Sequence, residues 1–215
     1  AMTSRPSPRR RHDAEAARAD ILAAALSEFA DYGYGGARID RIAAASGMSK
    51  PMIYSYFGDK DDLYAAALRE AYVQIREGER TLNLSNLAPS DAIRALVEFT
   101  LDHFIEKPWF VSMLNTENLR GGSTIRVIAD LTEIQSHLVT EIGIILDRGA
   151  AEGAFRQGVD PVELYITIAS LCYFPVANRH TLKSVFGRDL NDAAQLDLRR
   201  GLITDMVLAW LECRE

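Results

Sequence analysis

The amino-acid sequence predicts an all-α protein of about nine helices. Apolar residues recur every three or four positions through most of the 215 residues, which is the spacing of a helix with one buried face. No stretch alternates apolar and polar residues in the manner of a half-buried strand, and no segment repeats. In addition, two short amphipathic segments meet at Gly47 with the spacing of a helix-turn-helix.

Residues 1–12 are expected to form a flexible basic arm. Four arginines precede the first acidic residue, and Pro6 and Pro8 disfavour a helix there. Such an arm can follow DNA phosphates or enter a minor groove, although a solvated tail without defined contacts explains the pattern equally well. The first helix is then expected from about Asp13 to Asp31 and is expected to end at Gly33.

The next segment, IDRIAAASGMSKPMIYSYF, predicts a helix over about 39–46, a sharp turn, and a second helix over about 50–56. Gly47 can adopt the positive φ that the turn requires. Ser49 can cap the second helix, and Pro51 lies in its first turn, where a missing N–H costs little. The pattern makes DNA the leading partner, and an ordinary pair of core helices is the alternative.

The residues that follow, YSYFGDKDDL at 54–63, resemble the signature of the TetR family of transcriptional repressors, and the wider match runs from about Ala14 to Leu68. The resemblance implies an all-helical homodimer with a three-helix DNA-binding domain at residues 13–58. A larger effector-binding and dimerisation domain would follow at residues 59–215, beginning with a linking helix at 59–80. Effector binding would change the separation of the two DNA-reading heads and release the operator.

If the second helix of the motif reads DNA, the side chains on and around it have expected roles. Those expected to face a DNA groove are Lys50, Met52, Tyr54 and Ser55, and those expected to contact phosphates are Arg38, Ser49, Tyr56 and Lys60. For Tyr54, a ring that packs inward is an equally good interpretation. Ile53 and Phe57 are expected in the core. Arg38 replaces the usual threonine, and Pro51 and Met52 replace small residues common in the family, so the operator sequence does not carry over from relatives.

The acidic net charge of −6 is compatible with a DNA partner because the charge is unevenly divided. Residues 1–60 hold nine basic and seven acidic side chains, whereas the remainder holds 15 and 23. Neither a membrane-spanning run nor a signal peptide is visible, so a cytoplasmic protein is expected. Cys172 and Cys213 are expected to be buried free thiols, and the scattered histidines predict no metal site and no cofactor.

The remaining sequence predicts a loop followed by five helices. After the loop at 81–90, the expected helices span about 90–106, 109–119, 124–152, 161–185 and 192–213. The last two have broad apolar faces, which the family resemblance implies to form the homodimer interface. From the sequence alone, the core of a monomer would look the same.

An unidentified small-molecule effector is expected to bind among the helices between residues 59 and 185. The apolar candidates for its site are Trp109, Phe110, Met113, Tyr173 and Phe174, and the polar candidates are Glu117, Asn118, His137 and Asn178. Each has a competing structural role, and Glu117 in particular may close the turn near Gly121. The segment 107–122 weakly resembles a subgroup that includes the pyrimidine-utilisation regulator.

Two other functions are considered beside an effector-controlled repressor. A DNA-binding protein without an effector would need less than the roughly 135 residues that follow the linking helix. A helical enzyme is the second alternative, but the sequence contains no GxSxG, HExxH or phosphate-binding glycine loop.

Overall fold

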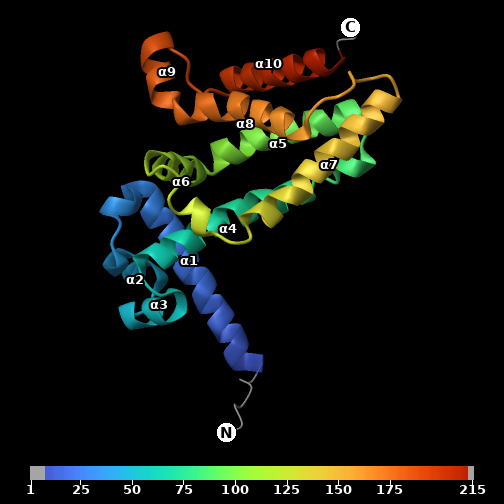
Figure 1. Ribbon diagram of the computed structural model, residues 1–215. Helices are drawn as coiled ribbons and strands as arrows, with labels where there is room; N and C mark the ends of the chain where they lie inside the picture. The colour runs from blue at the N-terminus through green and yellow to red at the C-terminus, as the bar shows by residue number, and fades with distance from the viewer. Residues whose placement is uncertain (1–7, 213–215) are drawn as a thin grey trace. The chain divides into compact units, whose positions relative to one another are not determined.

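The computed structural model describes residues 8–212, with side chains from residue 13 onward, and all regular secondary structure in this part of the chain is helical (Figure 1). It divides into two compact units, each described by itself. The head unit comprises Ala1–Tyr72 with Ser112–Ala129, and the body unit comprises Val73–Val111 with Asp130–Glu215. The predicted all-α class is therefore confirmed, with ten α-helices over residues 8–212 instead of about nine.

The head unit contains α1 (Pro8–Gly36), α2 (Ile39–Ser46), α3 (Lys50–Phe57) and the first half of α4 (Lys60–Arg80). The start of α1 lies five residues before the predicted one, because a proline fits the first turn of a helix. Residues 1–7 of the predicted arm lie outside the described residues. The predicted end at Gly33 is a break in α1, where φ is 65°, before one more turn reaches Gly36.

A small apolar core holds the head unit together. The side chains of Ile21, Phe29, Ile42, Ile53 and Leu63 are fully or almost fully buried, one or two from each helix. The start of α4 is fixed by a reciprocal cap, in which the Asp62 amide donates to Asp59 Oδ1 at 3.0 Å and the Asp59 amide donates to Asp62 Oδ2 at 3.2 Å. This is the cap that the sequence predicts at Asp59.

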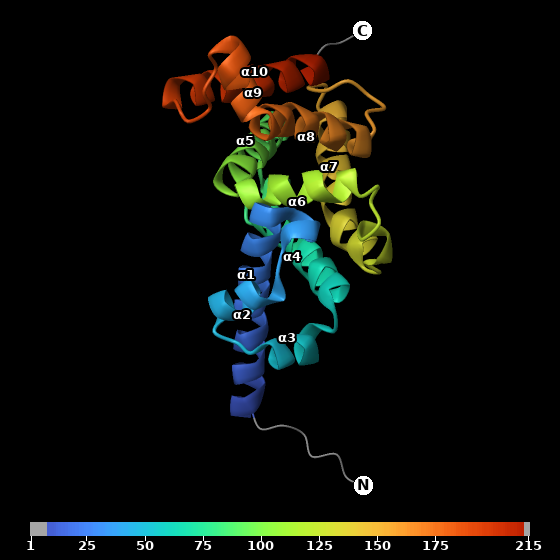
Figure 2. The same ribbon diagram turned by 90° about the vertical axis from the view of Figure 1, so that its left-hand side faces the viewer.

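The body unit is built around one central helix, α5 (Pro89–Glu106). The unit also contains η1 (Leu84–Asn86), part of α6 (Pro108–Leu119, shared with the head unit), α7 (Leu131–Ala151), α8 (Pro161–Ala177), α9 (Arg179–Phe186) and α10 (Ala193–Glu212). Helix α5 packs against α7, α8 and α10, so its side chains are buried around most of its circumference. Helices α8 and α10 lie side by side in both views (Figures 1 and 2).

Two predicted helices are wrong in extent. The helix predicted at 124–152 begins only at Leu131, because the buried Glu117 carboxylate accepts the amides of Thr124 and Ile125 at 2.6 and 2.9 Å. These contacts hold residues 125–127 in a short 3-10 turn, η2, in the head unit. The helix predicted at 161–185 is divided at Asn178 into α8 and α9, three residues after Pro175, which lacks the N–H of a continuous helix.

Cys172 is buried without a disulfide, as predicted, whereas Cys213 lies outside the described residues. Between residues 8 and 212, no helix is both long enough and apolar enough to cross a membrane.

Candidate nucleic-acid interface and ligand site

The turn between α2 and α3 has the geometry that its sequence predicts. Gly47 ends α2 with φ at 69°, a value that side chains with a Cβ rarely adopt. The Ser49 hydroxyl then accepts the Met52 amide at 3.4 Å, and Pro51 lies in the first turn of α3. Since these local contacts set the angle between the two helices, they fix how α3 is presented.

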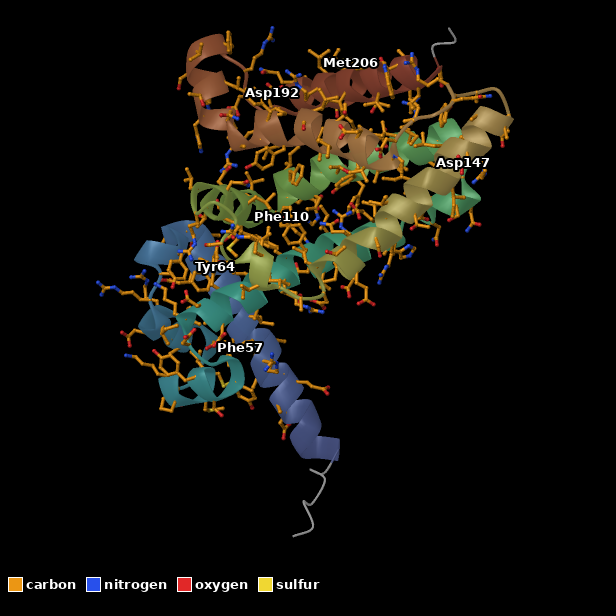
Figure 3. All side chains as sticks on the ribbon, viewed as in Figure 1. Phe57, Tyr64, Phe110, Asp147, Asp192 and Met206 are labelled. Atoms are coloured by element: carbon orange, nitrogen blue, oxygen red, sulfur yellow. The ribbon has the colours of Figure 1, made fainter. Side chains whose placement is uncertain are left out.

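One face of α3 packs inward and the other faces solvent. Ile53 and Phe57, the latter labelled in Figure 3, are buried. The Arg18 guanidinium of α1 lies 4.4 Å from the centroid of the Phe57 ring. At 100° per residue, Ser55 lies opposite these two side chains. The predicted DNA contacts that are exposed are Arg38, Ser49, Lys50, Met52, Tyr54 and Ser55, whereas Tyr56 and Lys60 are half-buried.

Both candidate lysines have partners within the head unit. Lys50 at the start of α3 forms an exposed ion pair with Asp40 of α2. Lys60 Nζ donates to the Ala37 carbonyl at 2.7 Å and lies 4.8 Å from the centroid of the Tyr34 ring. A phosphate contact by either ammonium therefore replaces or shares an existing interaction.

A carboxylate that the sequence analysis missed positions the start of α2. Glu28 of α1 is buried and accepts the Arg38 amide at 2.8 Å and Arg41 Nε at 2.8 Å. Burial raises the pKa of Glu28, but the hydrogen bonds from Arg41 and Arg38 outweigh it and leave the pKa below its ordinary value. Glu28 thus satisfies an amide at the helix start where Arg38 supplies no side-chain cap.

Three of the predicted effector contacts gather in the body unit. Phe110 of α6 and Tyr173 of α8 lie 5.9 and 5.8 Å from Phe104 of α5, measured between ring centroids. Trp109 contacts Phe110 edge-on, and His103 lies 5.3 Å from the Phe110 ring. These side chains form a single aromatic group on α5, α6 and α8, of which Phe110 is labelled in Figure 3.

The other predicted effector contacts are not brought to that group. Met113, Glu117 and Asn118 belong to the head unit, where Glu117 binds two backbone amides and Asn118 Nδ2 donates to the Leu114 carbonyl. In the body unit, His137 and Phe174 are exposed. Asn178 Nδ2 donates to the Phe174 carbonyl at 2.9 Å and thus caps the end of α8.

The body unit also buries charged residues that the sequence analysis did not select. Arg76 and Glu79 of α4 are 5% and 2% exposed, and Arg76 Nη1 lies 2.7 Å from Glu79 Oε2. Arg76 Nη2 donates to the Tyr165 hydroxyl of α8 at 2.5 Å. The signal was present in the sequence, because positions 76 and 79 continue the buried stripe of Leu68, Ala71 and Ile75 along α4.

The helix-turn-helix with an exposed recognition helix, joined to a helical body, defines a DNA-binding transcriptional regulator. Residues 21–67 match the family model described as "Bacterial regulatory proteins, tetR family", and residues 89–207 match "Tetracyclin repressor-like, C-terminal domain". The chain belongs to the TetR family. The family consists of regulators, so the enzyme alternative is set aside.

Individual relatives agree with this assignment. The chain is 37% identical over 191 residues to the HTH-type transcriptional repressor NicS of Pseudomonas putida, covering 89% of this chain and 90% of that protein. It is 28% identical to the HTH-type transcriptional regulator RutR of Escherichia coli, over 69% and 68% of the two chains. A TetR family regulator from Marinobacter aquaeolei has the same fold, with a TM-score of 0.68, 19% identity, and coverage of 96% and 100%.

Proposed function

We propose that this protein is a repressor that binds operator DNA as a homodimer and is released by a small-molecule effector. The observation that carries the proposal is the solvent-facing side of α3, which is held by the Gly47 turn and the Ser49 cap. The relatives named as repressors support the direction of regulation. In this proposal residues 13–58 read DNA and residues 59–215 bind the effector and dimerise, within the cytoplasm, where the DNA partner lies.

In the proposed complex, α3 enters a major groove. Lys50, Met52, Tyr54 and Ser55 then face base edges: all four are exposed, Ser55 lies opposite Ile53 and Phe57, and Lys50 is the first residue of α3. Arg38, Ser49, Tyr56 and Lys60 contact phosphates. A helix N-terminus with an uncharged cap is suited to a phosphate because its amides and dipole both favour an anion.

The proposed dimer interface is formed by α8 and α10, with the predicted extension into α9. Large apolar side chains are exposed at helical spacing on both helices: Val162, Ile166 and Phe174 on α8, and Leu198, Leu202, Met206 and Trp210 on α10. Between the two helices lies a largely apolar groove of about 420 Å³, lined by Met206 and Trp210 among others. Covering such a surface with a second copy removes apolar area from water.

Effector control follows from the dimer geometry. Two recognition helices bind successive major grooves only when they are roughly 34–36 Å apart. An effector that binds more tightly to a dimer with another separation shifts the population away from the DNA-bound form, by its difference in affinity for the two forms. Equal effector affinity in the presence and absence of operator would contradict this mechanism.

The DNA-binding mode is tested by selecting duplexes from a random pool and measuring the affinity of the selected duplex by fluorescence anisotropy. We expect Lys60→Ala to weaken binding to all duplexes similarly and to flatten the salt dependence, because a phosphate contact is lost. We expect Ser55→Ala to change the preference between duplexes instead. Thermal unfolding of both variants is the control, since Lys60 also contacts Ala37. An unchanged salt slope in Lys60→Ala contradicts the phosphate contact.

Removing the carboxylate beside Lys50 is expected to strengthen DNA binding. Asp40→Asn eliminates an exposed negative charge of the head unit and leaves the Lys50 ammonium free for DNA. We expect an affinity gain of about two- to fivefold, since exposed ion pairs are weak. Anisotropy titrations at two salt concentrations measure it, with Asp91→Asn in the exposed part of α5 as the control. A loss of affinity would mean that the pair positions α3 and that Lys50 does not bind DNA.

A further inference from the structure

A groove of about 460 Å³ lies between the second half of α4 and α5 in the body unit. Its α4 wall includes Gly78 and Leu82, and its α5 wall includes Ala95, Phe99 and His103. The Phe99 ring packs directly on Gly78, where a Cβ would lie only 2.5 Å from the ring. Pockets for small organic ligands measure about 300–1,000 Å³, so this groove has room for such a molecule.

One side of the groove is a row of carboxylates on α5. Glu98, Asp102 and Glu106 follow one another at intervals of four residues, so they lie on one face of the helix, and all three line the groove. Asp102 is paired with Arg200 of α10 at 2.6 Å, whereas the side chains of Glu98 and Glu106 have no partner in the described part of the chain. Lys107 adds one positive charge to the lining. The site therefore stays negatively charged even when Arg200 is counted, and it attracts a cation.

The wall of the groove also contains a buried polar atom that needs a partner. His103 is 5% exposed, and its Nε2 makes no hydrogen bond to the residues that the structure describes. Burial, assisted by the positive charges of Lys107 and Arg76, lowers the pKa of His103 to about 4, so the imidazole is neutral at neutral pH. A neutral imidazole has one nitrogen that accepts a hydrogen bond. Since native proteins leave few buried polar atoms unpaired, Nε2 indicates a bound molecule beside it.

We propose that this groove binds the effector, and that the effector is a small organic ammonium with an apolar body. This inference rests on the proposed function, because it names the ligand class for effector release. Glu106 and His103 are three positions apart on α5 and are therefore neighbours on the helix surface. The ammonium lies beside them and donates to the carboxylate and to Nε2. Its apolar body lies along Phe99 and Leu82.

The test uses the full-length protein and three probes of similar shape and different charge: phenethylamine, phenylacetamide and phenylacetate. Ligand-observed NMR titrations at neutral pH measure their affinities. We expect phenethylamine to bind at least about tenfold more tightly than phenylacetate, with phenylacetamide between them. The double variant Glu98→Gln with Glu106→Gln is expected to remove most of this preference. Glu133→Gln with Asp147→Asn, at exposed positions of α7, is the matched control and is expected to keep it.

Two further variants distinguish binding in the groove from a general attraction of cations. Ala95→Phe places a ring in the groove and is expected to abolish phenethylamine binding. His103→Phe keeps an aromatic ring but lacks Nε2, and it is expected to weaken phenethylamine binding by about fivefold. Thermal unfolding shows whether both variants fold. If either does not, the double carboxylate variant decides, because Glu98 is half-buried and Glu106 is exposed.

Four results would each overturn the inference. Phenylacetate could bind as tightly as phenethylamine, or the double carboxylate variant could keep the preference. A folded Ala95→Phe or His103→Phe protein could bind phenethylamine as the unchanged protein does. Finally, all three probes could fail to bind at concentrations on the order of 10 mM.

Operator binding, measured on the same samples, separates this inference from the proposed function. If the unchanged protein binds its selected duplex and no probe binds, the assignment of the groove is wrong and the DNA-binding function stands. If no duplex is selected, the proposed function fails whatever the probes do. Release of the duplex by phenethylamine, and not by phenylacetate, supports both, whereas phenethylamine binding that leaves operator affinity unchanged contradicts the effector role of the groove.

Discussion

Met206→Glu is expected to convert the dimer into a monomer and to lower operator affinity by at least about 100-fold. Met206 is 52% exposed on α10 within the apolar stripe that also includes Leu202. In the proposed homodimer the two-fold axis brings the same stripe of each copy to one interface, so one substitution introduces two carboxylates. Neither carboxylate gains a partner on burial, and an unpaired buried charge costs several kcal/mol.

The loss of DNA affinity follows from the loss of linkage between two heads. A dimer that has bound one half-site presents its second head at a high effective concentration, and a monomer does not. Sedimentation velocity measures the oligomeric state, and anisotropy with the selected duplex measures affinity. Leu119→Glu is the matched control, because Leu119 is an apolar residue 90% exposed on α6, outside the stripes of α8 and α10. A Met206→Glu protein that stays dimeric would place the interface elsewhere.

The DNA-reading motif was predictable almost residue by residue because its determinants are local. The positive φ at Gly47, the Ser49 cap and the Pro51 turn each depend on residues within four positions of one another. The same holds for the reciprocal cap of Asp59 and Asp62 at the start of α4. Local contacts of this kind are visible in sequence because the residue types and their spacing are sufficient to form them.

The two errors in helix extent have different causes. The start of α7 depends on Glu117, which binds the amides of Thr124 and Ile125, and periodicity alone continues the helix through that turn. The division between α8 and α9 was signalled by Pro175, but a proline inside a helix is compatible with either a kink or an end.

The two candidate sites differ in how far the sequence predicts them. The exposed face of α3 follows from the buried positions Ile53 and Phe57 and was predicted, although the DNA contacts themselves remain predictions. Arg76 and Glu79 were missed because charged residues are usually assigned to a solvated face. The buried Arg76 guanidinium donates to the hydroxyl of Tyr165, which lies 89 residues later in the chain. The local sequence around Arg76 does not show that contact.

His103→Gln is expected to make the free energy of unfolding less sensitive to acid. The part of the acid-induced loss that we attribute to His103, and that the variant lacks, is about 3 kcal/mol. His103 is 5% exposed, and its ring lies 5.7 Å from that of Phe99 and 5.3 Å from that of Phe110. Burial, assisted by the positive charges of Lys107 and Arg76, lowers the pKa of His103 from 6.5 to about 4. The folded protein therefore keeps this imidazole neutral where the unfolded chain protonates it.

The sign of the effect follows from that difference in proton binding. Between pH 6.5 and pH 4 the unfolded chain binds a proton that the folded protein refuses, so the free energy of unfolding falls as the pH is lowered through this range. Glu79 acts in the opposite direction: its pKa is raised to about 7, so stability is lost as the pH rises through 7. Comparison of the variant with the unchanged protein at each pH cancels the contribution of Glu79.

Urea unfolding at intervals between pH 7.5 and pH 4 measures this difference. The free energy of unfolding of His103→Gln, minus that of the unchanged protein, is expected to rise by about 3 kcal/mol as the pH is lowered across that range. This change does not depend on the difference at neutral pH. His180→Gln is the control, because its imidazole is exposed on α9. A difference independent of pH would mean that the folded protein accommodates a charged His103, which the surrounding aromatic rings and the nearby Arg76 oppose.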